Sequence, residues 1–432
     1  MPSDRQSAAW RDGVNQPAAT SPSDRQSAAW RDGVNQPARS TDTLTFGCRL
    51  NIAESETMRG LAARAGYAGA LIVNTCAVTG EAEAQARQAI RRAAREQPGR
   101  PILVTGCAAQ IAPETWAALP GVVRIIGNGV KLDPAAWSAP VAPIQRAAPM
   151  GIAASAGTRS FLAVQQGCDH ACTFCIIPQG RGPARALPIA EAVTTVRDLA
   201  TRHAEVVLTG VDLASHPELA ALIRAVLREV PELPRLRLSS LDPAALDEKF
   251  WRVFAEEPRL MPHLHLSAQH GHDLILKRMR RRHSRADLLQ LSRRARALRS
   301  DVALGADLIA GFPTETEEHL CALLDLVSEA GLSFLHVFPY SARAGTPAAR
   351  MPQLPMALRR ERAARLRAAG ETQLTRFLST RVGCIEQALM EADGMGHTPH
   401  FAAIRVQGAA RGALISARVT ASDGKTLMAE AA

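Results

Sequence analysis

The feature that most limits how this chain can fold is a regular alternation of apolar and amphipathic segments between residues 158 and 376. Apolar runs such as EVVLTGVD at 205–212 and DVALGADLIAGFP at 301–313 are separated by helix-like stretches such as AEAVTTVRDLATRH at 190–203. Strands and helices in this order form parallel sheets with right-handed crossovers, and about six such units favour a barrel over a flat sheet. We therefore expect a partial (β/α)6 barrel over 158–376 that binds its ligands at the carboxyl ends of the strands.

A second, open α/β domain is expected at 42–140. Three apolar runs, TLTF, ALIVNTC and PILVTGC, flank a long basic helix at roughly 80 to 96. A cysteine stands at or just after the end of each run: Cys48, Cys76 and Cys107. Because the carboxyl ends of parallel strands lie side by side at one edge of an open sheet, we expect the three thiols to converge there. The alternative is three separate buried residues, as single cysteines usually are.

The remaining segments complete this α/β fold class. Residues 2–18 recur without change at 22–38, so we expect a disordered tail over 1–41 that contains a duplicated 17-residue segment. Residues 141–157 are rich in Pro, Ala and Gly and are expected to be a linker. The stretch 377–432 alternates short apolar runs with glycine and predicts a small β-barrel, an accessory that often binds nucleic acid. Phe401 is its one evident aromatic residue for stacking on a base.

Charge and hydropathy narrow the function. No run approaches the roughly 18 apolar residues of a membrane span, and no apolar secretory segment is found, so we expect a cytoplasmic protein without a membrane partner. In the reducing cytoplasm, clustered cysteines are more often metal ligands than disulfides. The net charge of +10 suits a polyanion such as nucleic acid. The densest basic stretch, 277–299, is interpreted either as a solvated helix face or as a surface that contacts phosphates.

Three cysteines follow the first barrel run in the pattern Cys168-x3-Cys172-x2-Cys175. Zinc in a structural site takes four protein ligands, and His170, inside the loop, is a strained candidate for the fourth. The other candidate is an iron–sulfur cluster, which thiolates at such compact spacing hold. A [4Fe–4S] cluster on three thiolates keeps one iron open to an exchangeable ligand. Two further cysteines are expected to be core residues: Cys321 and Cys384.

The spacing of these cysteines, with Phe174 before the third, resembles the signature of the radical S-adenosylmethionine (SAM) superfamily. Four later stretches resemble, in order, the motifs of its methylthiotransferase branch: TGVD at 209–212, RLSSLDP at 237–243, HLHLSAQHGHD at 263–273 and GADLIAGFPTETEE at 305–318. The resemblance implies a [4Fe–4S] cluster whose open iron binds SAM, held by Cys168, Cys172 and Cys175. It also implies contacts to the cofactor from four residues: Phe174, Gly210, Ser239 and Gly311.

The first region resembles the same family, in which three N-terminal cysteines hold a second [4Fe–4S] cluster that supplies sulfur. In this chain, these are Cys48, Cys76 and Cys107. A second cluster has a chemical reason, because a carbon without useful acidity cannot exchange hydrogen for sulfur by ordinary acid–base catalysis. The resemblance therefore implies two [4Fe–4S] clusters together with SAM.

The substrate is indicated by two stretches, GCRLNIAESE at 47–56 and HVFPYSARAGTPAARMP at 336–352. They look most like the branch that adds a methylthio group to C2 of N6-threonylcarbamoyladenosine at position 37 of tRNA. This implies the anticodon stem-loop as partner, a TRAM-like RNA-binding barrel at 377–432, and a monomer. The alternatives are isopentenyladenosine in tRNA, an aspartate of a ribosomal protein, or a non-catalytic iron–sulfur RNA-binding protein.

Three departures from the family pattern bear on rate and on the geometry of the substrate loops. Gln179 stands where the family usually has tyrosine, and Ser267-Ala268-Gln269 differs from the usual sequence before its glutamine. The segment after Ser215 is shorter than the family leads one to expect.

Overall fold

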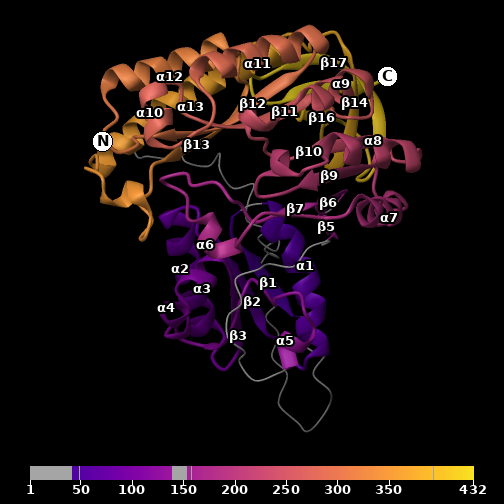
Figure 1. Ribbon diagram of the computed structural model, residues 1–432. Coiled ribbons are helices and arrows are strands. Elements are labelled where there is room, and N and C mark those ends of the chain that lie inside the picture. Colours follow the sequence, from indigo (N-terminus) through magenta and orange to yellow (C-terminus); the bar gives the residue numbers. More distant parts are fainter. Residues whose placement is uncertain (1–40, 48, 139–152, 157, 393) are drawn as a thin grey trace, which may run out of the picture. The chain divides into compact units, whose positions relative to one another are not determined.

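The computed structural model describes residues 41–47, 49–138, 153–156, 158–392 and 394–432, and the chain divides into two compact units at residues 149 and 150. The predicted tail over 1–41 lies outside the described residues except for Thr41, and so do Cys48 and most of the expected linker. Figure 1 labels the elements of both units. Among the described residues, no helix combines the length and the apolar character needed to cross a membrane.

The first unit is built on a parallel sheet in the order β1-β2-β3-β4. Strands β2 and β3 are buried along their whole length, as parallel strands covered on both faces are. Helix α2 begins after Thr79, whose hydroxyl accepts a hydrogen bond from Ala82 N, and buries Ala86 and Ile90. The elements are β1 (Asp42–Thr45), α1 (Arg49–Arg64), β2 (Leu71–Thr75), α2 (Gly80–Glu96), β3 (Ile102–Gly106), α3 (Cys107–Ile111), α4 (Pro113–Ala117), β4 (Val122–Ile126) and α5 (Ala135–Ser138).

The second unit contains the predicted partial barrel. Six parallel strands follow each other in the order β6-β9-β10-β11-β12-β13, and single bridges between Leu236 and Leu260 and between Leu241 and Leu266 join β10 to β11. Each strand leads to a helix, and α11, α12 and α13 lie along the outer side of β11–β13 (Figure 1). The strands are β6 (Arg159–Ala163), β9 (Glu205–Thr209), β10 (Arg235–Leu238), β11 (His263–Gln269), β12 (Ala303–Ala310) and β13 (Phe334–Pro339).

The helices that cover these strands are α7 (Ile189–Ala200), α8 (Leu219–Glu229), α9 (Glu248–Glu256), α10 (Asp273–Arg278), α11 (Arg285–Leu298), α12 (Glu317–Glu329) and α13 (Met356–Ser379). Short elements between them are β7 (Gln165–Gln166), α6 (Ile177–Arg181), β8 (Arg185–Ala186) and three 3-10 turns: η1 (Leu213–Ser215), η2 (Pro243–Ala245) and η3 (Pro347–Arg350).

One strand corrects the sequence analysis. β5 (Ala153–Ala156) falls inside the expected linker at 141–157, yet it pairs antiparallel with β6. Its sequence, AASA, carries no β-branched or large apolar residue that would have indicated a strand. The free edge of β6 therefore pairs with β5 rather than with β13, and the barrel remains partial.

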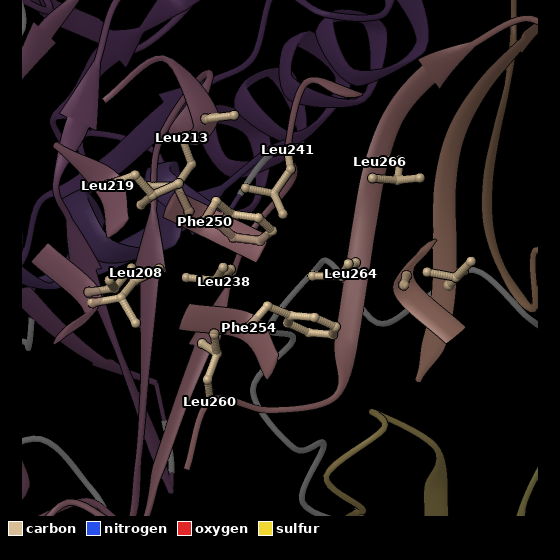
Figure 2. Close-up of a cluster of buried hydrophobic side chains, with 14 of the residues drawn as sticks. Leu208, Leu213, Leu219, Leu238, Leu241, Phe250, Phe254, Leu260, Leu264 and Leu266 are labelled. Atoms are coloured by element: carbon tan, nitrogen blue, oxygen red, sulfur yellow. The ribbon is translucent and has the colours of Figure 1, made fainter. Parts of the chain in front are cut away.

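Alternation along the strands separates a helix-facing side from a lumen-facing side. Leu208, Leu238 and Leu264 are fully or almost fully buried and pack with Phe250 and Phe254 of α9 (Figure 2). Successive side chains of a strand point to opposite faces, so on each strand the residues next to these leucines in the sequence face the lumen. Polar side chains hold several of these lumen positions: Glu205, Arg235, Arg237, His263, His265 and Asp307.

The C-terminal segment forms the predicted closed β-barrel, in the order β14-β15-β16-β18-β17. Helix α13 leads into it and spans the expected boundary between residues 376 and 377. Two of its strands, β15 and β18, were not indicated by the sequence. The strands are β14 (Ile385–Ala392), β15 (Met395–His397), β16 (Ala403–Val406), β17 (Leu414–Ser422) and β18 (Leu427–Ala431).

Phe401 of this small barrel closes the amino end of the partial barrel. Its ring lies between two guanidinium groups, with Arg159 Cζ 5.0 Å and Arg237 Cζ 5.1 Å from the ring centroid. Arg237 also donates a hydrogen bond of 3.0 Å to the carbonyl of Pro399 and binds Glu205 through both carboxylate oxygens, at 2.8 and 3.1 Å. The aromatic residue expected to stack on a base is thus used for packing inside the protein.

Candidate functional site

The loop that carries Cys168, Cys172 and Cys175 is fixed at both sides. Cys168 N donates to Gly182 O at 3.1 Å, and Thr173 donates from its backbone and hydroxyl to the carbonyls of Met279 and Arg278 at 3.1 and 2.8 Å. The loop follows β6 and β7, at the carboxyl end of the barrel, as the sequence predicted. The chain therefore presents the three thiols together on a braced loop.

The three thiols are close enough to influence each other electrostatically. Burial raises the pKa of Cys175 to about 12, and the neighbouring Cys172 and Cys168 add to this effect. Burial likewise raises the pKa of Cys168 to about 11, with further contributions from Asp212 and Cys172. Without a metal these two thiols stay protonated at neutral pH, so metal binding must displace their protons. A compact set of three thiols in a partly buried loop fits an iron–sulfur cluster.

Arg281 and Asp242 flank this loop, and sequence reasoning did not identify either one. Arg281 Nη1 donates to Cys172 Sγ at 3.5 Å, and its Nη2 lies 3.2 Å from Asp242 Oδ2 and 2.8 Å from Ser267 O. Despite burial, the pKa of Asp242 is lowered, mainly by Arg281, so its carboxylate is charged. The only indication of Arg281 in the sequence was the basic stretch 277–299 that contains it. That stretch was interpreted as a solvated helix face or as a surface that contacts phosphates, and not as part of the cysteine site.

Most arginines of the stretch 277–299 bond within their own unit, which corrects both interpretations of it. Arg282 pairs with Asp242 at 3.2 Å and Arg285 with Glu329 at 2.8 Å. Others donate to carbonyl groups: Arg296 to Ala330 O at 2.7 Å and Arg299 to Leu260 O at 2.5 Å. The stretch is mainly a structural brace on α10 and α11, and its exposed basic residues are Lys277, Arg280, Arg282 and Arg293.

His170 does not lie as the sequence suggested. Its Nε2 is 2.7 Å from Asp212 Oδ2 and 3.3 Å from Ser215 Oγ. Donor atoms of Cys168, His170 and Asp212 all lie within 4.8 Å of each other, so the loop conformation brings His170 toward the thiol instead of straining it away. The zinc alternative would need His170 beside all three thiols, and this group contains only Cys168 among them.

The four residues expected to contact the cofactor line the same end of the barrel. Ser239 follows β10, is 7% exposed, and its Oγ has no hydrogen-bond partner among the described residues. Gly210 follows β9, where a Cβ would come within 2.8 Å of Gln165 Cβ, and Gly311 follows β12 with φ +73°. Phe174 packs against a buried apolar cluster that includes Phe312. The unpaired buried hydroxyl of Ser239 can bind a polar ligand, whereas the space beside Gly210 and Gly311 is filled by Gln165 and Arg359. Both glycines are therefore needed for close packing within the protein.

In the first unit, Cys76 and Cys107 directly follow β2 and β3, whose last residues, Thr75 and Gly106, are register partners. Cys107 Sγ accepts a hydrogen bond from Asn128 Nδ2 at 3.6 Å. Gly47 lies against Cys76, since a Cβ there would come within 2.5 Å of the Cys76 sulfur. Cys48 lies outside the described residues. The neighbouring Gly47 nevertheless brings the chain to the edge where the other two thiols lie.

The two cysteines outside these sets correct the expectation that both belong to the core. Cys321 on α12 is exposed, and Cys384 is only partly buried. Cys321 directly follows the buried Leu320 on α12, and because neighbouring helix residues point about 100° apart, it lies off the buried face. Gln179, at the position of the departure from the family, is exposed on α6.

Comparison with known proteins supports this geometry. Residues 162–327 match the Radical SAM superfamily, and residues 41–127 match the uncharacterized protein family UPF0004. The solved structure of the radical S-adenosylmethionine methyltransferase TsrM from Kitasatospora setae has a TM-score of 0.51 at 16% identity, covering 69% of this chain and 68% of that one. This likeness concerns the fold alone.

Curated relatives match over most of their length. The threonylcarbamoyladenosine tRNA methylthiotransferase MtaB of Rickettsia prowazekii is 44% identical over 84% of this chain and 91% of its own. The protein of that name from Bacillus subtilis is 32% identical over 78% and 81%. A tRNA-2-methylthio-N(6)-dimethylallyladenosine synthase from Sorangium cellulosum is 33% identical over 80% of each chain. The chain therefore belongs to the methylthiotransferases of the radical SAM superfamily, which work with SAM and a [4Fe–4S] cluster.

Proposed function

We propose that this chain transfers a methylthio group to C2 of N6-threonylcarbamoyladenosine at position 37 of tRNA. The observation that carries the proposal is the 44% identity to a relative named for that nucleoside, over 91% of the relative's length. The braced cysteine loop at the carboxyl end of the barrel supports it, because it places metal ligands where a (β/α) barrel holds its active site.

Cys168, Cys172 and Cys175 are proposed to hold the cluster whose open iron binds SAM. When bound, the cluster and SAM supply one-electron cleavage of SAM and removal of hydrogen from an unactivated carbon. Arg281 offsets negative charge at Cys172, and Asp242 holds the guanidinium in place. Ser239 Oγ is proposed to donate a hydrogen bond to SAM, and Gly210 and Gly311 are proposed to contact it through their backbone at the ends of β9 and β12. Phe174 packs against the apolar cluster that includes Phe312 and so supports the loop.

A second cluster is proposed at Cys48, Cys76 and Cys107, with the role of sulfur source. The support is that Cys76 and Cys107 follow adjacent strands of one sheet and that Gly47 packs on Cys76. Iron analysis tests this assignment: about eight irons per chain are expected after anaerobic reconstitution, and about four in a Cys76→Ala, Cys107→Ala variant. Equal iron content in both proteins would remove the second cluster from the proposal.

We further propose that a single copy of the chain acts on the anticodon stem-loop in the cytoplasm. The domain division at 42–140, 158–376 and 377–432 then assigns sulfur supply to the first domain and radical chemistry to the second. The third is proposed as the TRAM-like RNA-binding barrel, since Arg405 and Arg411 are exposed on it and can contact phosphates.

The second candidate substrate is dimethylallyladenosine in tRNA, which the 33% identical relative from Sorangium cellulosum is named for. Nucleoside analysis of tRNA from a deletion strain decides between the two. Loss of the methylthio form of threonylcarbamoyladenosine, restored by the wild-type gene, is the expected result. If that nucleoside persists and the methylthio form of dimethylallyladenosine disappears, the second candidate is correct.

A further inference from the structure

A polar cluster in the lumen of the partial barrel is not used by the cysteine site. His265 on β11, Asp307 on β12 and His336 on β13 come from three neighbouring strands. Asp307 Oδ1 lies 3.0 Å from His265 Nε2 and 3.0 Å from His336 Nδ1, and Oδ2 accepts a longer hydrogen bond from Ser240 at 3.4 Å. The carboxylate thus orients both imidazole rings.

The exposed fraction of the side chain increases from His265 through Asp307 to His336. The side chain of His265 is 7% exposed, that of Asp307 is 20% exposed, and that of His336 is 48% exposed. Since His336 uses Nδ1 for Asp307, its Nε2 remains for a ligand in the lumen. Gly305 makes room for the inner ring, because a Cβ there would come within 2.5 Å of His265 Nδ1. The three residues therefore form a rigid polar surface that ends in an accessible imidazole nitrogen.

The cluster adjoins the cysteine site through the end of β10. Ser240 bonds to Asp307, the preceding Ser239 carries the unpaired buried hydroxyl, and Asp242 two residues later binds Arg281 beside Cys172. The segment Ser240 to Asp242 therefore contacts both the histidine–aspartate cluster and the arginine beside the cysteine loop. In adenine, C2 and the N6 amino group lie on the same edge of the base, separated by N1. A group on N6 must therefore be accommodated beside the reacting carbon.

We propose that His265, Asp307 and His336 form a subsite that binds the polar N6 substituent of the substrate adenosine, with a doubly protonated His336 donating from Nδ1 to Asp307 and from Nε2 to the free carboxylate of the substituent. This inference rests on the proposed function, because a threonylcarbamoyl group carries a carboxylate and a hydroxyl whereas a dimethylallyl group is a hydrocarbon. A hydrocarbon placed here would desolvate two imidazoles and a carboxylate without replacing their hydrogen bonds, which is costly. The subsite thus selects between the two candidate substrates.

The test compares two synthetic anticodon stem-loops with the reconstituted protein: one carries threonylcarbamoyladenosine, and the other carries its methyl ester, which lacks the carboxylate charge. For the wild type we expect the ester to raise KM by about ten- to hundredfold, the value of a lost hydrogen bond to a charged group. His336→Phe should raise KM for the acid by a similar factor and no longer distinguish the two RNAs, while kcat changes less than KM.

Two conservative variants distinguish the roles of the two imidazole nitrogens of His336: Nε2, which is proposed to bind the ligand, and Nδ1, which contacts Asp307. The amide nitrogen of glutamine can replace Nε2, and that of asparagine can replace Nδ1. We therefore expect His336→Gln to keep part of the preference for the acid and His336→Asn to lose it. Arg293→Ala, an exposed change on α11, serves as the matched control and should keep the wild-type KM for both RNAs.

Several results would overturn the subsite. The first is an equal KM of the wild type for the acid and the ester, a measurement that does not depend on the folding of any variant. The second is a His336→Phe variant that still prefers the acid as strongly as the wild type does. A third result concerns metal content, because two histidines and a carboxylate can also hold a metal ion. If plasma mass spectrometry finds one divalent metal per chain in the wild type and none in His265→Ala, the cluster is a metal site instead. If the wild type methylthiolates neither RNA but does modify a dimethylallyladenosine stem-loop, the proposed function fails, and that outcome is distinct.

Discussion

The two ends of the partial barrel are built from the same alternation of strands, yet they differ in how their polar groups are paired. At the amino end, Glu205 lies within 3.6 Å of Arg159, Arg235 and Arg237, and the C-terminal barrel covers the group. At the carboxyl end, thiols with raised pKa values and the unpaired hydroxyl of Ser239 remain. The chain thus fills one end with its own ion pairs, whereas the other end presents thiols and a hydroxyl that a ligand can bind.

This difference shows how one barrel lumen can hold ion pairs that stabilise the fold at one end and ligand-binding groups at the other. The closed end uses long-range ion pairs, which stabilise only when both charges are present. At the open end, the thiols and the Ser239 hydroxyl are available to bind ligands. Changes at the closed end should therefore reduce stability, and changes at the open end should reduce activity.

The largest expected effect is at the open end. Cys172→Ala removes one of three proposed cluster ligands, so we expect methylthiolation to fall below detection and the iron content to fall by about four per chain. Iron analysis together with detection of 5′-deoxyadenosine measures this. Cys321→Ala, an exposed cysteine on α12, is the matched control and should retain both. Retention of iron in Cys172→Ala would mean that the loop does not hold the cluster.

At the closed end, Glu205→Gln should lower the free energy of unfolding by about 3–5 kcal/mol, because it leaves buried guanidinium groups without their carboxylate. Although burial opposes it, Arg237 and its neighbours hold the pKa of Glu205 at about 2, so the carboxylate is charged in the folded protein. Urea unfolding of the metal-free protein measures the loss. Asp198→Asn, which breaks an exposed pair with Arg202, is the control, and an equal loss in both variants would contradict the comparison.

A smaller effect is expected for Arg281→Ala, which keeps the proposed cluster ligands but removes the cation beside Cys172. Residues of this kind, which touch a metal ligand, typically change metal affinity or activity about 10- to 100-fold. We expect kcat for methylthiolation to fall within that range, and Arg281→Lys to restore part of it. A shift of the cluster's reduction potential in the variant would separate an electrostatic role from simple loss of folding.

The smallest effect concerns pH at the closed end. Burial opposes the charge of His400, but Asp301 at 3.0 Å and Glu386 at 3.4 Å raise its pKa above the ordinary value of 6.5. A raised folded pKa contributes stability that is fully present below pH 6.5 and is lost as pH rises through the folded value. The difference in unfolding midpoint between the wild type and His400→Gln should therefore shrink as pH increases from 6 to 9. A constant difference would show that His400 is uncharged.

Much of the fold followed from local pattern. The apolar runs at 205–212 and 301–313 correspond to β9 and β12, and the stretch predicted as a small β-barrel forms the closed barrel β14–β18. β5 was missed because AASA has no apolar signal and is a strand only by pairing with β6. For the site, the sequence predicted that Cys76 and Cys107 follow adjacent strands and that the loop with Cys168, Cys172 and Cys175 follows the first barrel strand. Arg281 and Asp242 could not be found in the same way, because they meet only when the connection between α10 and α11 packs against the segment after β10.

The sequence by itself determined the order of strands and helices, the strand-end position of the cysteines and the family, because periodicity and spacing are properties of neighbouring residues. The tertiary structure decided which polar residues have partners. Phe401, an apparent base-stacking residue, fills the closed end, and most arginines of 277–299 bond to carbonyls and carboxylates of their own unit. His265, Asp307 and His336 come together only across three strands. Such contacts depend on strand register and burial, which local sequence patterns do not encode.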